Sequence, residues 1–420
     1  MYQVSIDQIA KEMGLTYLGP SNRTIRNIAF DSREISQGDL FVAIRGQRVD
    51  GHRFIEQAIQ SGAAAVAVDA EHAFESDTTG CLIVDDGQAF IQALGKWCRS
   101  QFQGPVVAIT GSQGKTSTKD LLAQVCARSH KVVVTKENQN NELGMPLTLT
   151  RLNEETEILI VEMGMTGFGE IDFLCQIAQP THAIITGIGL VHAEYLGSQQ
   201  GIARAKTELF KYLPPTGTIA LREKDHALMS PYLNECAASI IWCSDEGEGG
   251  EFISKNVQLG AESSSFDCQM NDEAFHIDLP FAGRHFVDNA LLVTAVARAI
   301  DISIADIQNG LGLAVSLSSS RMEMHKLAGN RLLINDCYNA NPDSMMATLD
   351  VLAGYQPRPT IACLGNMYEL GQYEHDGHAK VGEHLAKIGI DWLICLGNLA
   401  EIIGTSAIAA GMDASHVFYV

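Results

Sequence analysis

A glycine-rich turn with a lysine and hydroxyl side chains follows the β-branched apolar run at residues 106–110. Gly111 and Gly114 let backbone N–H groups converge on an anion, and the helix that opens near Lys115 directs its positive dipole end at the same point. Lys115 would reach the β- and γ-phosphates of a nucleotide, and Thr116 would offer a hydroxyl to Mg²⁺. The predicted ATP-binding residues of this turn are Gly111, Ser112, Gln113, Gly114, Lys115, Thr116 and Ser117.

The turn departs from the usual nucleotide-binding pattern at one position. Ile109 stands where the Walker spacing places its first glycine, so the loop is a short variant. The alternative is a strand-to-helix turn that needs glycine only for its geometry. A strand, a Gly-Lys-Thr run and a helix in this order favour nucleotide binding.

Two polar residues stand where apolar strands end. Glu162 closes the run at 158–162, and His192 follows the run at 183–188. Ligands of open α/β sheets bind at the carboxyl ends of the strands, so both residues are candidates to hold Mg²⁺ together with Thr116. A helix cap or surface charge at Glu162 and a structural role for His192 are the alternatives.

Lys206 lies in an apolar stripe. In the helix expected over 198–212, helical spacing puts it on the same face as Ile202 and Leu209. An ammonium group there is costly unless it is paired or chemically altered. A depressed pKa would make the neutral amine available for modification, or an acid such as Glu162 could pair with the charged amine. The alternative is that the stem packs while the amine reaches water.

Three later residues are candidates for a nucleotide site. Asn289 stands near the start of an alanine-rich helix, which it could cap, or it could contact a nucleotide base. Arg321 opens a third α/β stretch, and Asp336 follows a strand of that stretch. A basic residue and an acid supplied by a separate domain suit an ATP site that closes, and surface salt bridging is the alternative.

Strands and helices alternate through most of the chain, which predicts α/β architecture with three domains. Residues 1–98 form a small α/β domain, residues 99–313 a central doubly wound domain with a mostly parallel sheet, and residues 314–420 a Rossmann-like α/β domain. The strands 331–334, 360–364 and 392–396 are expected to share one parallel sheet in the last domain. Weak alternation at 268–279 predicts edge strands, and the serine-rich segment 314–320 is the linker candidate.

Composition excludes several classes of function. The formal net charge of −21 opposes binding to nucleic acid, whose phosphates are neutralised by Lys and Arg. No apolar stretch is long enough to span a bilayer and no signal peptide is evident, so a cytoplasmic protein without a membrane partner is expected. The ten cysteines contain no Cys-x-x-Cys pair, which predicts reduced, mostly buried thiols.

Several runs of residues together resemble the bacterial Mur ligases, over the whole length of the chain. Residues 31–33, 38–43 and 50–52 are similar to the UDP-sugar-binding domain of that family. Residues 110–116 are similar to its ATP signature, and residues 138–146 are similar to a substrate-contacting segment.

Two further runs are similar to one branch of the family, the branch that adds D-alanyl-D-alanine. They are residues 338–344 and 364–371, and the Asp-Asn-Pro-Arg motif of the branch that adds diaminopimelate or lysine is absent. Two departures stand out. Phe286 occupies the place of the asparagine that the family usually has after Gly-Arg-His, and the chain ends short of a basic segment found near the end of most relatives.

The resemblance implies an ATP- and Mg²⁺-dependent ligase, acting as a monomer, that joins D-alanyl-D-alanine to UDP-N-acetylmuramoyl-tripeptide through an acyl phosphate. It implies catalytic roles for Lys115, Glu162, His192 and Lys206, with Mg²⁺ on Thr116, Glu162 and His192 and with Lys206 carbamylated. It implies that Asn289 contacts the adenine and that Arg321 and Asp336 complete the ATP site. The implied substrate-binding residues are Asp31, Ser32, Arg33, Asn140, Asn141, Tyr338, Asn339 and Asn341.

Two other readings remain open. One is another ATP-dependent amino-acid ligase of the same superfamily, such as one that extends folate with glutamate. The other is a regulatory ATPase that uses hydrolysis to change conformation.

Overall fold

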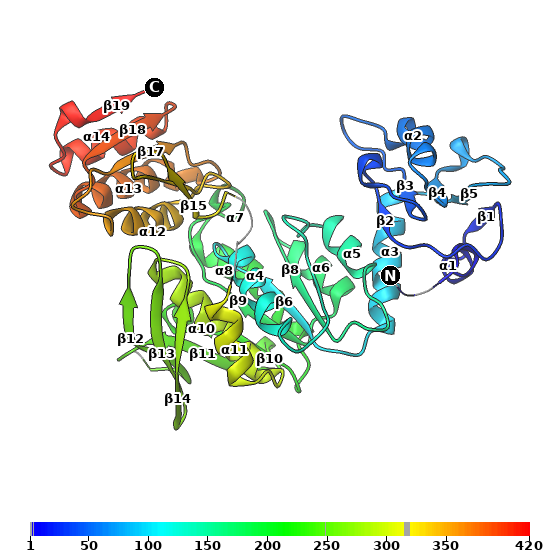
Figure 1. Cartoon of the computed structure of the whole chain (residues 1–420), viewed down its shortest axis with the longest axis horizontal. Helices are drawn as coiled ribbons and strands as arrows, with labels where there is room; N and C mark the ends of the chain where they lie inside the picture. The colour runs from blue at the N-terminus through cyan, green and yellow to red at the C-terminus, as the bar shows by residue number, and fades with distance from the viewer. Residues whose placement is uncertain (1, 3, 248, 315–319) are drawn as a thin grey trace. The chain divides into compact units, whose positions relative to one another are not determined.

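The computed structural model describes residues 1–420 except 1, 3, 248 and 315–319 (Figure 1). The chain forms two compact units, which alternate along the sequence. The first unit comprises residues 1–106, 130–163 and 173–180, and the second comprises residues 107–129, 164–172 and 181–420. The expected linker at 314–320 lies almost entirely outside the described residues. The predicted domain limits at residues 98 and 313 stay predictions.

The N-terminal part of the first unit is built on a sheet in the order β1-β5-β4-β3-β2, in which only the β1–β5 pair is antiparallel. Its strands are β1 (Thr16–Leu18), β2 (Ile28–Ala29), β3 (Leu40–Val42), β4 (Ala65–Val68) and β5 (Gly80–Ile83). Its helices are α1 (Ile6–Met13), α2 (Ile55–Gln60) and α3 (Gly87–Gln101), with the short 3-10 helices η1 (Ser32–Glu34), η2 (Gly51–Phe54) and η3 (Ala70–His72).

Successive residues of a strand point to opposite faces of the sheet, and here both faces are covered by apolar side chains. Leu40 and Ala65 belong to one apolar core, whereas their neighbours Phe41 and Val66 belong to another. Each of the three 3-10 helices begins after an aspartate whose carboxylate accepts a backbone N–H of that turn, namely Asp31, Asp50 and Asp69. Aspartate is a favoured capping residue, so these turns are fixed by local sequence.

The remainder of the first unit contains the parallel pair of β7 (Val132–Val134) and β8 (Ile158–Glu162). The helix α5 (Gly144–Leu149) lies between them in sequence, and α6 (Glu170–Ala178) follows β8. All residues of β8 are buried. Glu162 therefore stands at the carboxyl end of a buried strand, as the sequence predicts.

In the second unit, strands are hydrogen-bonded in the order β14-β13-β12-β11-β10-β9-β6. The pairs from β6 to β12 are parallel, and β13 and β14 add antiparallel edges, which confirms the edge strands expected at 268–279. The strands are β6 (Val106–Thr110), β9 (His182–Ile185), β10 (Thr218–Arg222), β11 (Ser239–Asp245), β12 (Phe252–Leu259), β13 (Ser264–Met270) and β14 (Glu273–Leu279).

The helices of this part of the second unit include α4, which follows the glycine turn at 111–114, and α10, which is long and largely buried. They are α4 (Lys115–Cys126), α7 (Ala193–Leu196), α8 (Gln199–Thr207), η4 (Phe210–Tyr212), η5 (Glu223–Asp225), α9 (His226–Met229), η6 (Ser230–Glu235), α10 (Arg284–Ala299) and α11 (Ile304–Gly312). The single helix expected over 198–212 is in fact two, α8 and η4.

The C-terminal part contains a parallel sheet in the order β17-β18-β19, covered by helices, and a separate antiparallel pair, β15 and β16. Its strands are β15 (Glu323–Leu327), β16 (Arg331–Asn335), β17 (Ile361–Gly365), β18 (Trp392–Leu396) and β19 (Val417–Tyr419). Its helices are α12 (Pro342–Ala353), η7 (Gly371–Tyr373), α13 (Glu374–Ile388), α14 (Ala400–Ala409) and η8 (Ala414–His416).

The expectation that 331–334 shares the parallel sheet is wrong. The preceding turn is closed by Gly329 and Asn330, both with positive φ, and residues of this kind in that conformation form tight hairpins. The strand therefore pairs back on β15.

The α/β class with mostly parallel sheets is confirmed. None of the helices in the described part of the chain combines the length and apolar character that a bilayer-spanning segment needs. All ten cysteines are free, and most are buried. Burial raises the pKa of the Cys98 and Cys126 thiols to about 12, which makes them inert core residues, as expected.

Candidate functional site

The turn between β6 and α4 requires glycine at two positions. Gly111 has φ +149°, and a side chain there would collide with the Thr186 hydroxyl. Gly114 has φ +75°, and a Cβ there would lie 2.9 Å from the amide of Asn289. L-residues with side chains avoid such φ values, so backbone conformation and space both demand glycine.

Hydrogen bonds hold this turn to the segment after β9. Ser112 donates its backbone N–H to the Gly187 carbonyl and its hydroxyl to the Gly189 carbonyl, each at 2.9 Å. The Thr186 hydroxyl donates to the Gln113 carbonyl. Lys115 donates from Nζ to the Gly111 carbonyl at 2.8 Å. The loop is thus preformed by contacts within the second unit.

Three cationic candidates gather in the second unit around this turn. Burial lowers the pKa of His192 most, and the nearby side chains of Lys115 and Lys206 lower it further, whereas the hydrogen bond that its ring donates to Glu369 raises it. Burial and the charge of Lys115 likewise lower the pKa of Lys206 well below its ordinary value. The lowered pKa values favour the uncharged forms of His192 and Lys206, so Lys115 is the group of the three that offers a positive charge to a phosphate at this turn.

Lys206 is almost completely buried, with 1 % of its surface exposed. It lies on α8 near the buried residues Ile202 and Leu209, which confirms the apolar stripe. The alternative in which the amine reaches water is wrong, since the side chain lies inside the core. A neutral amine is the favoured form in such a place.

Glu162, in the first unit, has the chemistry of a cation ligand. Its carboxylate is buried, with Oε1 accepting a 2.8 Å hydrogen bond from Asn140 and Oε2 having no hydrogen-bond partner among the described residues. A buried carboxylate oxygen without a partner costs free energy, and an oxygen-binding cation would remove that cost. In the second unit the Thr116 hydroxyl is also buried. Carboxylate and hydroxyl oxygens are the donors that Mg²⁺ takes, so each of the two residues by itself has the chemistry of a Mg²⁺ ligand.

Asn289 lies within α10, which begins five residues earlier at Arg284, so the helix-cap alternative is wrong. It is buried, contacts Gly114 and accepts a 3.2 Å hydrogen bond from Arg222. Arg222 is itself buried and pairs with Asp288 at 3.1 Å. Sequence analysis missed Arg222, although its place at the carboxyl end of β10 was a usable signal. Contact of Asn289 with adenine stays a prediction.

A second residue that sequence analysis missed is Asp225, in the turn after β10. Its buried carboxylate accepts the Ile188 N–H at 3.2 Å, and burial raises its pKa. The charge of Asp343, at the start of α12, raises it further, and a Cβ on Gly189 would meet Asp343 Oδ2 at 2.6 Å. The C-terminal part of the second unit thus adds an acid beside the glycine turn.

Arg321 and Tyr338 stack, with the guanidinium 4.0 Å from the ring centre. Arg321 also lines a pocket of about 280 Å³ whose wall includes Phe281 and Phe286, two rings stacked 4.9 Å apart. Phe286, the residue that departs from the family pattern, is therefore part of an apolar wall.

Asp336 accepts the Met322 N–H at 3.1 Å and the Thr348 hydroxyl at 2.5 Å. In the described part of the chain, neither Asp336 nor Arg321 takes part in a salt bridge. The salt-bridge alternative for this pair is therefore wrong, and their part in an ATP site stays a prediction.

The remaining predicted substrate residues are partly engaged in turns. Asp31 pairs with Arg33 at 2.5 Å, and the Ser32 hydroxyl donates to Gln57 at 3.0 Å. Asn141 accepts the Gly144 N–H at 2.9 Å, Asn341 caps α12, and Asn339 is exposed. Asp31, Asn141 and Asn341 thus have structural roles. Each would have to bind substrate while keeping these contacts, or give them up.

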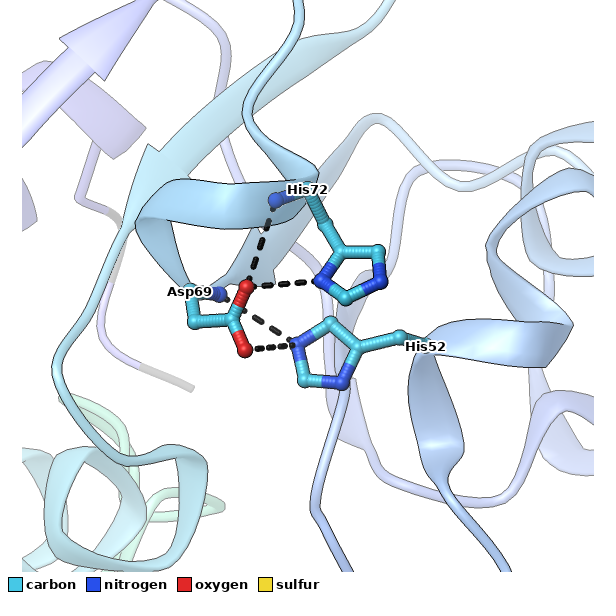
Figure 2. Close-up of side chains that lie close together, drawn as sticks. All are labelled: His52, Asp69 and His72. Carbon is cyan, nitrogen blue, oxygen red and sulfur yellow. Dashed lines mark hydrogen bonds and ion pairs between the residues drawn. The ribbon is translucent and has the colours of Figure 1, made fainter.

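A histidine and carboxylate cluster lies in the N-terminal sheet domain of the first unit. Asp69 lies beside the rings of His52 and His72 and contacts a nitrogen of each, and candidate ligand atoms of the three lie within 4.8 Å of one another (Figure 2). The two rings are stacked 4.2 Å apart and tilted by 24°. Lone pairs lie in the ring planes, so nearly parallel rings do not direct them at one ion.

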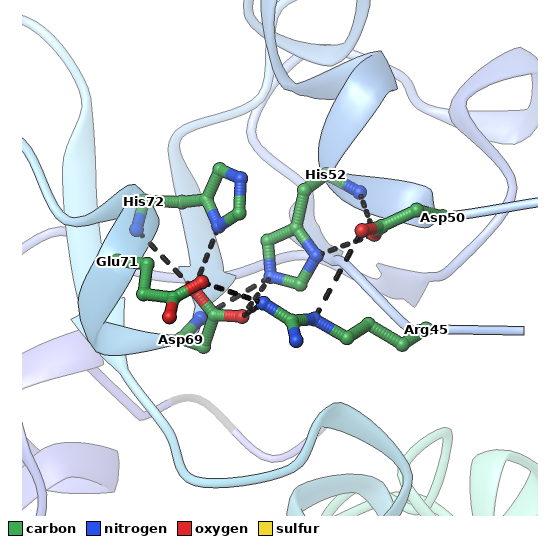
Figure 3. Close-up of polar contacts among 6 residues, drawn as sticks. All are labelled: Arg45, Asp50, His52, Asp69, Glu71 and His72. Atoms are coloured by element: carbon green, nitrogen blue, oxygen red, sulfur yellow. Dashed lines mark hydrogen bonds and ion pairs between the residues drawn. The ribbon is translucent and has the colours of Figure 1, made fainter.

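Charged neighbours complete this cluster as a hydrogen-bond network. Asp50 bonds to His52 Nδ1 at 2.7 Å, and Arg45 pairs with Asp69 at 2.6 Å and with Glu71 at 3.0 Å (Figure 3). His52 is buried, so the network joins the turn at 50–54 to the end of β4. We assign it a structural role in this domain.

Comparison with known proteins gives consistent matches. Residues 24–96 match the catalytic domain of the Mur ligase family, residues 109–297 match the Mur ligase middle domain, and residues 320–420 match the Mur ligase glutamate ligase domain. The UDP-N-acetylmuramoyl-tripeptide–D-alanyl-D-alanine ligase of Synechocystis is 36 % identical over 93 % of this chain and 82 % of its own length. The Bacillus subtilis ligase of the same name is 33 % identical over 97 % and 88 %.

Solved structures agree. MurF from Acinetobacter baumannii is 29 % identical with a TM-score of 0.84, covering 100 % of this chain and 90 % of its own. MurF from Thermotoga maritima in complex with ADP is 26 % identical with a TM-score of 0.75, covering 94 % and 93 %. From these identities over nearly its whole length, the chain belongs to the Mur ligase family.

Proposed function

We propose that this chain is an ATP-dependent ligase that joins D-alanyl-D-alanine to UDP-N-acetylmuramoyl-tripeptide in peptidoglycan synthesis. The observation that carries the proposal is the glycine turn with Lys115, beside which Lys206 and His192 lie with lowered pKa values. Its relatives over most of their length are ligases named for this reaction.

The proposed reaction has two steps. A carboxylate oxygen of the tripeptide attacks the γ-phosphorus of ATP, and the bond to the bridging oxygen breaks to release ADP. The dipeptide amine then attacks the acyl carbon, phosphate leaves, and the nitrogen loses a proton. Lys115 and the N–H groups of the glycine turn would neutralise charge on the transferred phosphoryl group and align it with the attacking oxygen.

Thr116, Glu162 and His192 would hold Mg²⁺, which supplies charge neutralisation at the phosphates when bound. Asn289, Arg321 and Asp336 would complete the nucleotide site. Residues 31–33 would contact the UDP sugar, and the other substrate contacts would come from Asn140, Asn141, Tyr338, Asn339 and Asn341. The three-domain division at residues 98 and 313, the monomeric state and the cytoplasmic location belong to the same proposal.

Lys206 is proposed to carry a carbamate. Its neutral amine would attack carbon dioxide, form an N–C bond and release a proton, which leaves an anionic group. Burial and the lowered pKa support the uncharged amine that this step requires. The product would be an acid able to orient Mg²⁺ in an apolar setting.

Phosphate release, measured with both substrates together and with each omitted, tests the proposal. The ligase requires ATP, the UDP-linked tripeptide and the dipeptide together, and Lys115→Ala should abolish the signal. Turnover of ATP without either substrate would favour a regulatory ATPase. Release driven by a different amino acid would favour another ligase of the superfamily.

A further inference from the structure

Glu369 reaches His192 from a position 177 residues further along the chain. Its carboxylate Oε2 is hydrogen-bonded to Nδ1 of the His192 ring. Both residues belong to the second unit, Glu369 in the loop between β17 and η7 and His192 immediately before α7. The reaction as proposed above gives Glu369 no part.

This loop and the start of η7 together contact both ends of α7. The carbonyl of Glu369 accepts the Glu194 N–H at 3.1 Å, and Gln372 donates from Nε2 to the Gly197 carbonyl at 3.0 Å. The backbone of Gly371 lies so close to α7 that a Cβ there would be 2.9 Å from Glu194 Cα. The contact between Glu369 and His192 is therefore part of a docked surface and not an isolated pair of side chains.

The local backbone also shows that this arrangement is imposed by its surroundings. His192 has φ +55° and Glu369 has φ +62°, and neither is a glycine. Such conformations persist where neighbouring contacts determine them. Both residues of this contact have that conformation.

The chemistry of the contact fixes which ring nitrogen of His192 carries a proton. A carboxylate only accepts hydrogen bonds, so Nδ1 must be the donor. In the neutral ring the lone pair is then on Nε2, the nitrogen that remains available to a ligand. Carboxylates commonly orient ligand histidines through the other ring nitrogen in this way.

We propose that Glu369 is a positioning residue for the ligase reaction, which holds His192 as the tautomer protonated at Nδ1 and presents Nε2 to the nucleotide and its cation. This inference rests on the proposed function. Glu369 can hold His192 only when residues 366–372 are packed against α7. Packing of this segment and the tautomer of His192 are therefore coupled.

The direct test is nuclear magnetic resonance of protein labelled with ¹⁵N-histidine, in which protonated and unprotonated ring nitrogens give separate signals. Loss of signals in His192→Gln assigns this residue. We expect wild type to show protonated Nδ1 and unprotonated Nε2, and Glu369→Gln and Glu369→Ala to show averaging between the two tautomers. Gln372→Ala, which removes a contact of the same loop without touching His192, should keep the wild-type pattern.

Ligation kinetics provide the second measurement. Glu369→Gln should weaken activation by Mg²⁺ or lower kcat by about 10- to 100-fold. Gln372→Ala should stay within about threefold of wild type, the effect of one hydrogen bond. Equal losses in both variants with unchanged ¹⁵N signals would overturn the positioning role, since only docking would then matter. Absence of ligation by the wild type would instead refute the proposed function, whatever the ring signals show.

Discussion

Asn140 donates a 2.8 Å hydrogen bond to one oxygen of Glu162, while the other oxygen of that buried carboxylate has no hydrogen-bond partner among the described residues. One acceptor is thus fixed in place, and the second is open to a ligand as far as the described residues show. The fixed amide orients the carboxylate, and the open oxygen makes Glu162 the strongest cation ligand candidate in the first unit.

Glu162→Gln should remove the stabilisation that Mg²⁺ with ADP gives to the wild type, which is about 2.7 kcal/mol at a hundredfold excess over Kd. Activity should fall at least about 100-fold, because several kcal/mol of charge stabilisation at the phosphates depends on the bound cation. Chemical unfolding with and without Mg²⁺ and ADP measures the first effect. Glu157→Gln, at an exposed position immediately before the same strand, is the control and should respond to the ligand like wild type. A full ligand response in Glu162→Gln would contradict the assignment.

Lys206→Met should leave the fold intact and abolish ligation. The folded-state pKa of Lys206 is lowered by burial, so the unfolded chain binds the extra proton at neutral pH and this lysine lowers stability there. The cost shrinks as pH rises toward the ordinary lysine value of 10.5. In buffer depleted of carbon dioxide, Lys206→Met should therefore be more stable than wild type at pH 7 by a margin that decreases toward pH 10. Lys211→Met, with a half-exposed side chain, should show no such gain.

The carbamate on Lys206 has its own test. Wild-type protein in ¹³C-bicarbonate should show a carbamate carbon signal that is missing from Lys206→Met. A wild-type spectrum without that signal, in protein that ligates at full rate, would remove the carbamate from the mechanism.

His285 should make the second unit sensitive to acid. Burial lowers its pKa to about 4. Above pH 6.5 the ring is neutral in both the folded and the unfolded chain. Between pH 6.5 and 4 only the unfolded chain takes up the proton. The free energy of unfolding therefore falls by up to about 3 kcal/mol over this range. Unfolding by urea between pH 4 and 7 should show a flatter profile for His285→Gln. His276→Gln is a control of opposite sign, because hydrogen bonding to Asp267 raises the pKa of His276. An unchanged profile in His285→Gln would count against a neutral buried ring.

Gly114→Ala should weaken nucleotide binding as well as stability. The backbone strain at φ +75° costs about 1–2 kcal/mol, and the new methyl group would press on the Asn289 amide. We expect ADP affinity, measured by calorimetry, to fall at least about tenfold, which corresponds to the same energy. Gly14→Ala separates the two causes, since Gly14 has φ +67° with open space around it. It should lose stability but keep ADP affinity, and equal ADP binding in both variants would argue against the glycine turn as the phosphate site.

Local sequence was sufficient where one segment determines its own structure. The glycine turn, the strand that ends at Glu162 and the burial of Lys206 follow from spacing within about a dozen residues. Sequence was insufficient where distant segments meet: Arg222 reaches Asn289 across 67 residues, and Glu369 reaches His192 across 177. The hairpin of β15 and β16 was missed for another reason. The apolar residues 331–334 suggested a strand of the parallel sheet, although Gly329 and Asn330 just before them are residues typical of a hairpin turn.

One apolar core has an implication for how the protein is made. Leu147, on α5, packs in the same core as Ile9 of α1 and the sheet residues Leu40 and Leu82, although it lies far beyond that sheet in the sequence. A ribosome that has delivered only the first hundred residues has therefore released a sheet with one side incompletely covered. The nascent chain must remain exposed, or be shielded by a chaperone, until α5 has left the exit tunnel.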